Sequence, residues 1–253
     1  MTSFHPSDDP REDLSDNQRP SLGRLSAQLN SLNVRDRVLA MIELQKETMP
    51  AQDAYPLVQQ ALRDEAVQVR GMAVFSLGIK PTPDSLSQLI QILESDSDYN
   101  VRAMAAGALG YLADKQAFEA LRHVFFEDTS WLVRFSAAVA LGNLKDLQAT
   151  TVLMEALESD QTLLQEAAVT ALGEIGAIDQ VERILDFASS DDWMMRKRVA
   201  EALGNLPCSK SRSALRYFST DAHPQVAEAA SRSLQRLETR SDIASLSRSL
   251  ITE

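Results

Sequence analysis

A motif that recurs every 31 or 32 residues constrains this chain more than any other feature of its sequence. One copy, WLVRFSAAVALG, runs from Trp131 to Gly142. Two degenerate copies, around Arg35 and Leu234, flank five clear ones. The clear copies end at Gly78, Gly110, Gly142, Gly173 and Gly204, with spacings of 32, 32, 31 and 31 residues. A constant period of this length is typical of solenoids, in which each repeat packs only on its neighbours.

Apolar residues within each copy follow helical spacing. Val133, Ala137 and Leu141 stand at i, i+4 and i+8, which predicts one buried face of an α-helix. The glycine after the closing leucine is expected to end the helix in the left-handed conformation. The closing apolar positions, all expected to be buried, are Ile42, Leu77, Leu109, Leu141, Leu172, Leu203 and Leu234.

A second amphipathic segment lies between consecutive copies, such as LQATTVLMEALESD at 147–160. Acidic residues at or near the ends of these segments are predicted to cap the next helix: Asp98, Asp128, Asp160 and Asp192. Helix, turn and helix at this period, with no competing strand pattern, predict an all-α fold. We expect an α-solenoid of about seven short HEAT-like helical hairpins over residues 19–253. A polar, acidic segment at 1–18 is expected to be a disordered tail.

Composition narrows the classes of function. The net charge is −11, and no basic face is evident, which argues against nucleic acid as a partner. The single cysteine, Cys208, excludes an internal disulfide and fits a reducing compartment. No apolar run approaches the roughly 18 residues of a membrane span, and the amino terminus lacks the pattern of a signal peptide. These features predict a soluble intracellular protein without membrane insertion.

Arginines recur at one place in the motif: Arg35, Arg70, Arg102, Arg134 and Arg196. Aligned arginines could bind a row of phosphates. Their place in the first helical turn, a few residues after an aspartate, favours instead a structural ion pair with that acid or with the turn of a neighbouring repeat.

Residues suited to catalysis or metal binding are few and scattered. His5, His123 and His223 lie apart from one another and from Cys208, without metal-ligand spacing. No phosphate-binding loop is present. The sequence therefore predicts neither a metal site nor catalytic residues, and it favours a binding protein over an enzyme.

Positions that differ between copies carry the functional information. Tyr99, Trp131 and Trp193 stand three residues before the aligned arginine; they either cover the core between repeats or form a ridge that binds a partner. A second set varies along the motif helices. It is apolar in copies two to four and charged in copies five and six: Met72, Phe75, Met104, Phe135 and Val139, then Glu166, Lys197, Arg198 and Glu201. These residues either line a concave protein-binding surface or contact the adjacent repeat.

The pattern Val-Arg-x-x-Ala-x-x-x-Leu-Gly resembles the short HEAT-like repeats of the phycobilisome-lyase type, over about residues 20 to 250. Three stretches carry a closer resemblance, DTSWLVRFSAAVALGNLKD, LLQEAAVTALGEIG and DDWMMRKRVAEALGNL. They are similar to the cyanobacterial NblB family of phycobilisome-degradation proteins. That family is itself similar to the CpcE and CpcF subunits of the phycocyanin bilin lyase.

The resemblance implies a scaffold that binds phycobiliproteins, helps to dismantle the antenna and favours bilin detachment. One alternative is a subunit of a phycobilin lyase that attaches phycocyanobilin, which implies a heterodimer. Another is an assembly factor for iron–sulfur or photosystem proteins, or an adaptor for another folded protein. The expected location is the cytoplasm, at thylakoid-bound phycobilisomes.

No tightly bound cofactor is implied, and phycocyanobilin enters as a transient ligand whose propionates would pair with Arg134 and Arg196. A chain of net charge −11 does not attract acidic phycobiliproteins, so partner contacts are expected to be local and apolar. The expected contact residues are Tyr99, Trp131, Phe135, Trp193, Met72, Phe75, Met104 and Val139.

Overall fold

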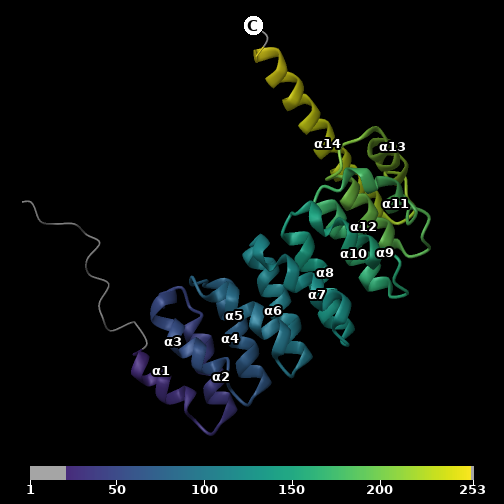
Figure 1. Ribbon diagram of the computed structural model, residues 1–253. Coiled ribbons are helices and arrows are strands. Elements are labelled where there is room, and N and C mark those ends of the chain that lie inside the picture. The colour runs from purple at the N-terminus through teal and green to yellow at the C-terminus, as the bar shows by residue number, and fades with distance from the viewer. Residues whose placement is uncertain (1–20, 252–253) are drawn as a thin grey trace, which may run out of the picture. The chain divides into compact units, whose positions relative to one another are not determined.

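The computed structural model describes residues 21–251, with side chains described through residue 239, and contains α-helices but no strand in that range (Figure 1). The expected disordered tail at 1–18 lies outside the described residues. The helices are α1 (Leu22–Leu29), α2 (Val34–Leu44), α3 (Ala51–Ala61), α4 (Val67–Ile79), α5 (Ser85–Ser95), α6 (Tyr99–Leu112), α7 (Phe118–Glu127), α8 (Trp131–Asn143), α9 (Thr150–Leu157), α10 (Thr162–Glu174), α11 (Val181–Leu185), α12 (Trp193–Leu203), α13 (Ser209–Phe218) and α14 (Pro224–Ile251).

The chain divides into two compact units, residues 1–76 and 77–253. The division falls within α4. The first unit contains α1 to α3 and most of α4, and the second contains the end of α4 and α5 to α14.

Consecutive helices form hairpins, from α1–α2 to α13–α14, and we number these hairpins as repeats 1 to 7. In the second unit, the second helices of neighbouring repeats pack in series: α6 on α8, α8 on α10, α10 on α12 and α12 on α14 (Figure 1). Most first helices also pack against the second helix of their own repeat, as α5 does on α6 and α7 on α8. The predicted all-α solenoid is therefore confirmed.

The predicted apolar stripe forms the core. Val133, Ala137 and Leu141 of α8 are fully buried, and each buried leucine of this kind contributes about 1.5–3 kcal/mol. The prediction is wrong in repeats 1 and 7, since Leu234 of repeat 7 is only partly buried. In repeat 1, Ile42 is 43% exposed, whereas Leu44 is buried, because the motif of this copy lies two residues further along than its sequence similarity suggests.

The repeated glycines have a different role from the one expected. Gly78, Gly110, Gly142 and Gly173 lie inside helices, and Gly204 at the end of α12 has right-handed helical angles. A Cβ atom on Gly142 would lie 2.7 Å from the Ala171 Cβ of the next repeat and 2.8 Å from its Cα. Gly110 and Gly173 meet the same obstacle. The glycine therefore permits close approach of neighbouring helices.

Left-handed residues occur three positions after the repeated glycine instead. They are Ala113, Lys145 and Gly176, with φ of 53°, 50° and 75°. The motif glycine and the left-handed residue that follows the helix are thus different residues.

The predicted acidic caps hold at two of four positions. Asp98 and Asp192 accept a hydrogen bond from the backbone N–H two residues later, at the starts of α6 and α12. Asp128 and Asp160 are not caps, because α8 begins after Ser130 and α10 after Gln161. Asp128 instead makes a contact between repeats.

Candidate protein-binding surface

In repeats 1, 3 and 6, an arginine at one place in the repeat ties its own turn to the turn of the next repeat. Arg102 donates from Nε and Nη2 to both carboxylate oxygens of Asp128, at 2.7 and 3.0 Å, and from Nη1 to the Asp96 carbonyl at 2.8 Å. Arg196 does the same with Asp221, at 2.8 and 3.0 Å, and with the Ser190 carbonyl at 2.8 Å. The predicted structural ion pair is confirmed for these two arginines.

These pairs are shielded from water, and they hold the carboxylates ionised. Burial acts to raise the pKa of Asp128, but the hydrogen bonds from Arg102 and from the Ser130 N–H outweigh it and leave this pKa lowered. At Asp221 the hydrogen bond from Arg196 is the largest effect, and the pKa is again lowered. A bidentate guanidinium–carboxylate contact of this kind is directional as well as strong.

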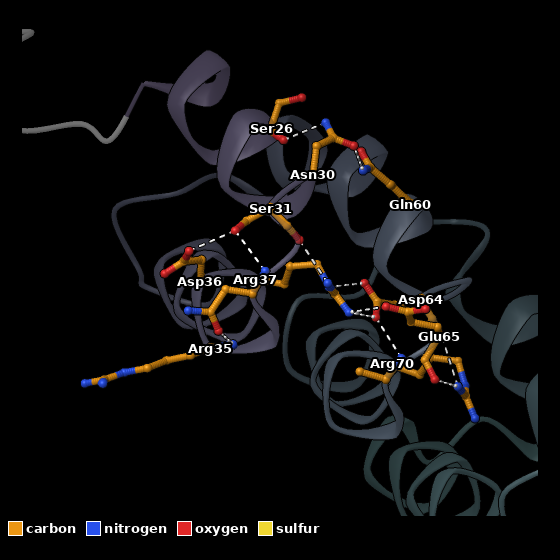
Figure 2. A network of polar contacts seen from close by, with 12 residues as sticks. Ser26, Asn30, Ser31, Arg35, Asp36, Arg37, Gln60, Asp64, Glu65 and Arg70 are labelled. Atoms are coloured by element: carbon orange, nitrogen blue, oxygen red, sulfur yellow. Dashed lines mark hydrogen bonds and ion pairs between the residues drawn. The ribbon is translucent and has the colours of Figure 1, made fainter.

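In repeat 1 the arginine of this position is Arg37, and the assignment to Arg35 is wrong. Arg37 forms an ion pair with Asp64 at 2.9 Å and donates from Nη1 to the Ser31 carbonyl at 2.9 Å. Figure 2 shows Arg37 directed at Asp64, whereas the exposed side chain of Arg35 extends away from this network. The same two-residue offset explains why Ile42 is exposed and Leu44 is buried.

The acid that accepts hydrogen bonds from the arginine always has the same place in its repeat, which we call the turn position. Its side chain accepts the backbone N–H two residues later, as Asp128 does from Ser130 at 2.8 Å. The residues that make this contact are Ser31, Asp64, Asp96, Asp128, Ser159, Ser190 and Asp221. Repeats 5 and 6 thus carry serine where repeats 2, 3, 4 and 7 carry aspartate.

Repeat 5 also departs from arginine itself. Gln165 occupies the arginine position there and donates to the Ser159 carbonyl at 2.7 Å. The turn position of the next repeat is also neutral there, because it is Ser190. Arg134 of repeat 4 is different, because the turn position opposite it is Ser159, which carries no carboxylate.

The turn aromatics fall into two groups. Trp193 stacks on His223 of repeat 7, with ring centroids 4.1 Å apart and planes 11° apart, so it covers the boundary between two repeats. Tyr99 and Trp131 are 49% and 48% exposed. The nearest ring to Trp131 is Phe135 of its own helix, at 6.4 Å.

A groove of about 300 Å³ lies between α8, α10 and α12. Its apolar side is formed by Phe135 and Val139 of α8 and by the exposed Leu163 of α10. Trp131, Phe135 and Val139 follow one another at i, i+4 and i+8, so they form one stripe along α8. This stripe, with Leu163, is the surface that we call the α8 face.

The groove also has three charged residues in its lining, Glu166, Glu174 and Arg198. Glu166 is largely buried, and burial is the main cause of its raised pKa, with repulsion from Asp192 second. Arg198 lies 3.9 Å from Glu166 and forms its closer ion pair with Glu201, at 3.2 Å. Two residues of the predicted apolar set, Phe135 and Val139, thus line the same groove as two residues of the predicted charged set, Glu166 and Arg198.

The other expected contact residues lie elsewhere. Met104 of α6 is exposed in the second unit, outside the groove. Met72 and Phe75 belong to α4 in the first unit, where Met72 is partly buried and Phe75 is exposed.

Sequence reasoning missed Leu163 and Ser159. Leu163 follows the start of α10 and breaks no pattern, so the sequence carries no direct signal for its exposure. The serine at 159 was visible, because it interrupts a regular series of aspartates. The predicted cap in this repeat is instead Asp160, whose side chain is exposed.

Cys208 has a local structural role. Its sulfur accepts a hydrogen bond from the Ser211 N–H at the start of α13 and lies 3.2 Å from the Ser211 hydroxyl. Within the described residues, no group of three or more His, Cys, Asp or Glu side chains could hold a metal ion. Nor does that part of the chain contain a helix with the length and apolar character to cross a membrane.

A family model described as HEAT repeats matches residues 86–173, 159–235 and 181–253. The fold resembles a chain in the structure of the complex of CpcE and CpcF of phycocyanin lyase from Nostoc sp. (TM-score 0.58, 20% identity, 92% of this chain and 100% of that one). It also resembles the YibA protein of Escherichia coli (TM-score 0.54, 16% identity, 85% and 92%). At these identities the likenesses show the fold alone. The comparison with curated proteins finds no match.

Proposed function

The chain belongs to the HEAT-repeat family, and from this premise we propose that it is a scaffold that binds phycobiliproteins through the α8 face. The observation that carries the proposal is the groove between α8, α10 and α12, where the half-exposed Leu163 lies with Phe135 and Val139. The half-exposed Trp131 precedes Phe135 by one helical turn on α8. Exposed aromatic and aliphatic side chains around a groove are typical of the centre of a protein interface.

The phycobilisome enters through two further arguments. The motif resembles phycobilisome-lyase-type repeats, and the fold similarity to a chain of the CpcE–CpcF complex extends over 92% of this chain. The net charge of −11 also disfavours long-range attraction to acidic partners, so affinity would depend on local apolar contacts such as the α8 face.

The first experiment mixes the purified protein with phycocyanin and follows co-elution and visible absorbance. We expect co-elution. Loss of bilin absorbance on binding supports a role in antenna disassembly, because detachment separates the chromophore from the protein that shapes its spectrum. Absence of any complex contradicts the proposal.

Variants locate the contact. We expect Phe135→Ala to weaken binding tenfold or more, as truncation of an interface hot spot does, with unchanged helical circular dichroism. Tyr217→Ala is the matched control, because Tyr217 is an exposed aromatic residue outside the groove. Equal losses in both variants would show that the contact does not depend on the α8 face.

The alternative of a bilin lyase subunit is tested with apophycocyanin and free phycocyanobilin. Attachment would appear as covalently bound bilin absorbance after denaturation. A lyase-type heterodimer would further require a second subunit for activity, so attachment by this chain alone contradicts that form of the alternative.

A further inference from the structure

The guanidinium of Arg134 has no hydrogen-bond acceptor among the residues that the structure describes. Its Nε is buried and unbonded, and no described residue forms a hydrogen bond or an ion pair with this guanidinium. Arg102 and Arg196, at the same place in repeats 3 and 6, each bind a carboxylate and a backbone carbonyl. A buried donor without an acceptor costs folding free energy, so the Arg134 guanidinium is available to an acceptor from another molecule.

The cause is one residue in the next repeat. Ser159 occupies the turn position opposite Arg134, where Asp128 and Asp221 stand opposite the other two arginines. The Ser159 hydroxyl accepts the Gln161 N–H, at 3.1 Å, and it offers no charge.

Neighbouring acids do not supply the carboxylate that is missing opposite Arg134. Asp128 is attracted electrostatically to Arg134, but both of its carboxylate oxygens accept hydrogen bonds from Arg102. Asp160 follows Ser159 and has an exposed side chain that makes no ion pair with Arg134.

Repeats 5 and 6 show a different arrangement at a turn position that lacks an acid. Ser190 also replaces aspartate at the turn position, and there the residue opposite is the neutral Gln165. Among repeats 3 to 6, only repeat 4 has an arginine at this place with no aspartate at the turn position of the next repeat. The guanidinium of Arg134 therefore lacks the carboxylate that completes the equivalent arginines.

Resting on the proposed function, we infer that Arg134 binds a carboxylate of the partner, in the manner of the Arg102 and Arg196 pairs. The ligand class follows from those pairs, because the same side chain in the same helical turn holds a carboxylate through two parallel hydrogen bonds. Trp131 precedes Arg134 by three residues on α8 and is exposed, so an apolar group beside the carboxylate would contact its ring. The source is an acidic side chain of a phycobiliprotein or a bilin propionate.

The direct test uses a small probe and needs no partner. 3-Phenylpropionate carries a carboxylate and an aromatic ring, and 3-phenylpropanamide is its uncharged match. In ¹⁵N-labelled protein we expect the acid to shift the indole N–H signal of Trp131 and the amide to leave it nearly unchanged. The Trp193 signal is an internal control, because Arg196 beside it already holds Asp221. Equal shifts with both probes, or no shift, overturn the inference.

Two variants should abolish the response for opposite reasons. Arg134→Gln removes the guanidinium, and Ser159→Asp supplies the carboxylate missing from the turn position. Ser190→Asp is the control for the second variant, since it adds the same charge opposite Gln165. A Trp131 shift that survives in Arg134→Gln or Ser159→Asp contradicts the assignment.

The last experiment measures how the same variants bind phycocyanin. We expect Arg134→Gln and Ser159→Asp to weaken phycocyanin binding about tenfold, the usual effect of losing a charge-assisted hydrogen bond. The same loss with bilin-free apophycocyanin identifies an acidic side chain as the source, and a loss confined to the holoprotein identifies the propionate. A probe response without phycocyanin binding supports the site and contradicts the proposed function. Phycocyanin binding that both variants leave intact contradicts the inference alone.

Discussion

Two boundaries between repeats contain a tryptophan and an arginine at equivalent places, but these side chains are paired at only one of the two. Between repeats 6 and 7, Trp193 stacks on His223 and Arg196 binds Asp221. Between repeats 4 and 5, Trp131 is half exposed and no described residue accepts a hydrogen bond from Arg134. We call these the 6–7 and the 4–5 boundary.

The difference lies in the turn that faces each helix. The turn of repeat 7 contributes Asp221 and His223, whereas the turn of repeat 5 contributes Ser159 and has neither an acid nor a ring at those places. A tryptophan and an arginine thus stabilise the fold at one boundary and are left for a partner at the other. A residue in a repeat protein acquires its role from the neighbouring repeat.

The largest effect should come from the packing that both boundaries share. Gly142→Ala is expected to lower the free energy of unfolding by about 2–3 kcal/mol, because its Cβ would overlap the Ala171 backbone. Gly107→Ala is the control: a Cβ there meets nothing within 4 Å, so better helix propensity should stabilise by about 0.5–1 kcal/mol. Chemical denaturation measures both. Equal effects at the two glycines would contradict the close-approach explanation.

Opening the 6–7 boundary should have the next largest effect. Asp221→Ser leaves Arg196 without its carboxylate, and we expect a loss of about 2 kcal/mol at neutral pH. Asp160→Asn is the matched control at the 4–5 boundary, where the acid is exposed and unpaired with Arg134. A comparable loss in that control would mean that Asp160 closes the 4–5 boundary in solution.

The same variant has a distinct pH dependence. The hydrogen bond from Arg196 lowers the pKa of Asp221, so folding is favoured when this carboxylate is ionised. This stabilisation is complete above the unfolded pKa of about 3.9 and is lost as the pH falls through the lower folded value. The stability gap between wild type and Asp221→Ser should therefore shrink on acidification below about pH 4. A gap that is constant with pH would contradict the ion pair.

The two tryptophans should differ by a smaller amount. Trp193→Ala removes the stack on His223 and is expected to cost about 1 kcal/mol. Trp131→Ala should change stability by no more than about 0.5 kcal/mol, while weakening phycocyanin binding. Thermal unfolding and co-elution separate the two effects. Unfolding of Trp131→Ala would assign this side chain to the core.

The smallest effect should be a gain. Ser159→Asp gives Arg134 a carboxylate and is expected to stabilise the fold by about 0.5–1 kcal/mol. Ser190→Asp, opposite Gln165, should give no gain. A similar gain in both variants would indicate an effect of charge at the start of a helix, without a contribution from Arg134.

The sequence by itself determined the architecture. The 31–32-residue period and the apolar spacing of Val133, Ala137 and Leu141 predicted the helices and their buried faces correctly. Hydrophobic periodicity is a local property, so it survives in a single sequence. It failed in repeat 1, where Arg35 and Ile42 match the motif in letters while Arg37 and Leu44 match it in space.

Only the tertiary structure decided which of the equivalent residues are engaged. Trp131 and Trp193 have the same place in the motif, as do Arg134 and Arg196, so position within a repeat does not distinguish them. The partners of Trp193 and Arg196 come from one turn, 30 and 25 residues later, and the register of these contacts depends on how two hairpins pack. For the same reason the close approach at Gly142 appears only when α10 lies against α8. Contacts between repeats set these roles, because burial and pairing are properties of neighbours in space.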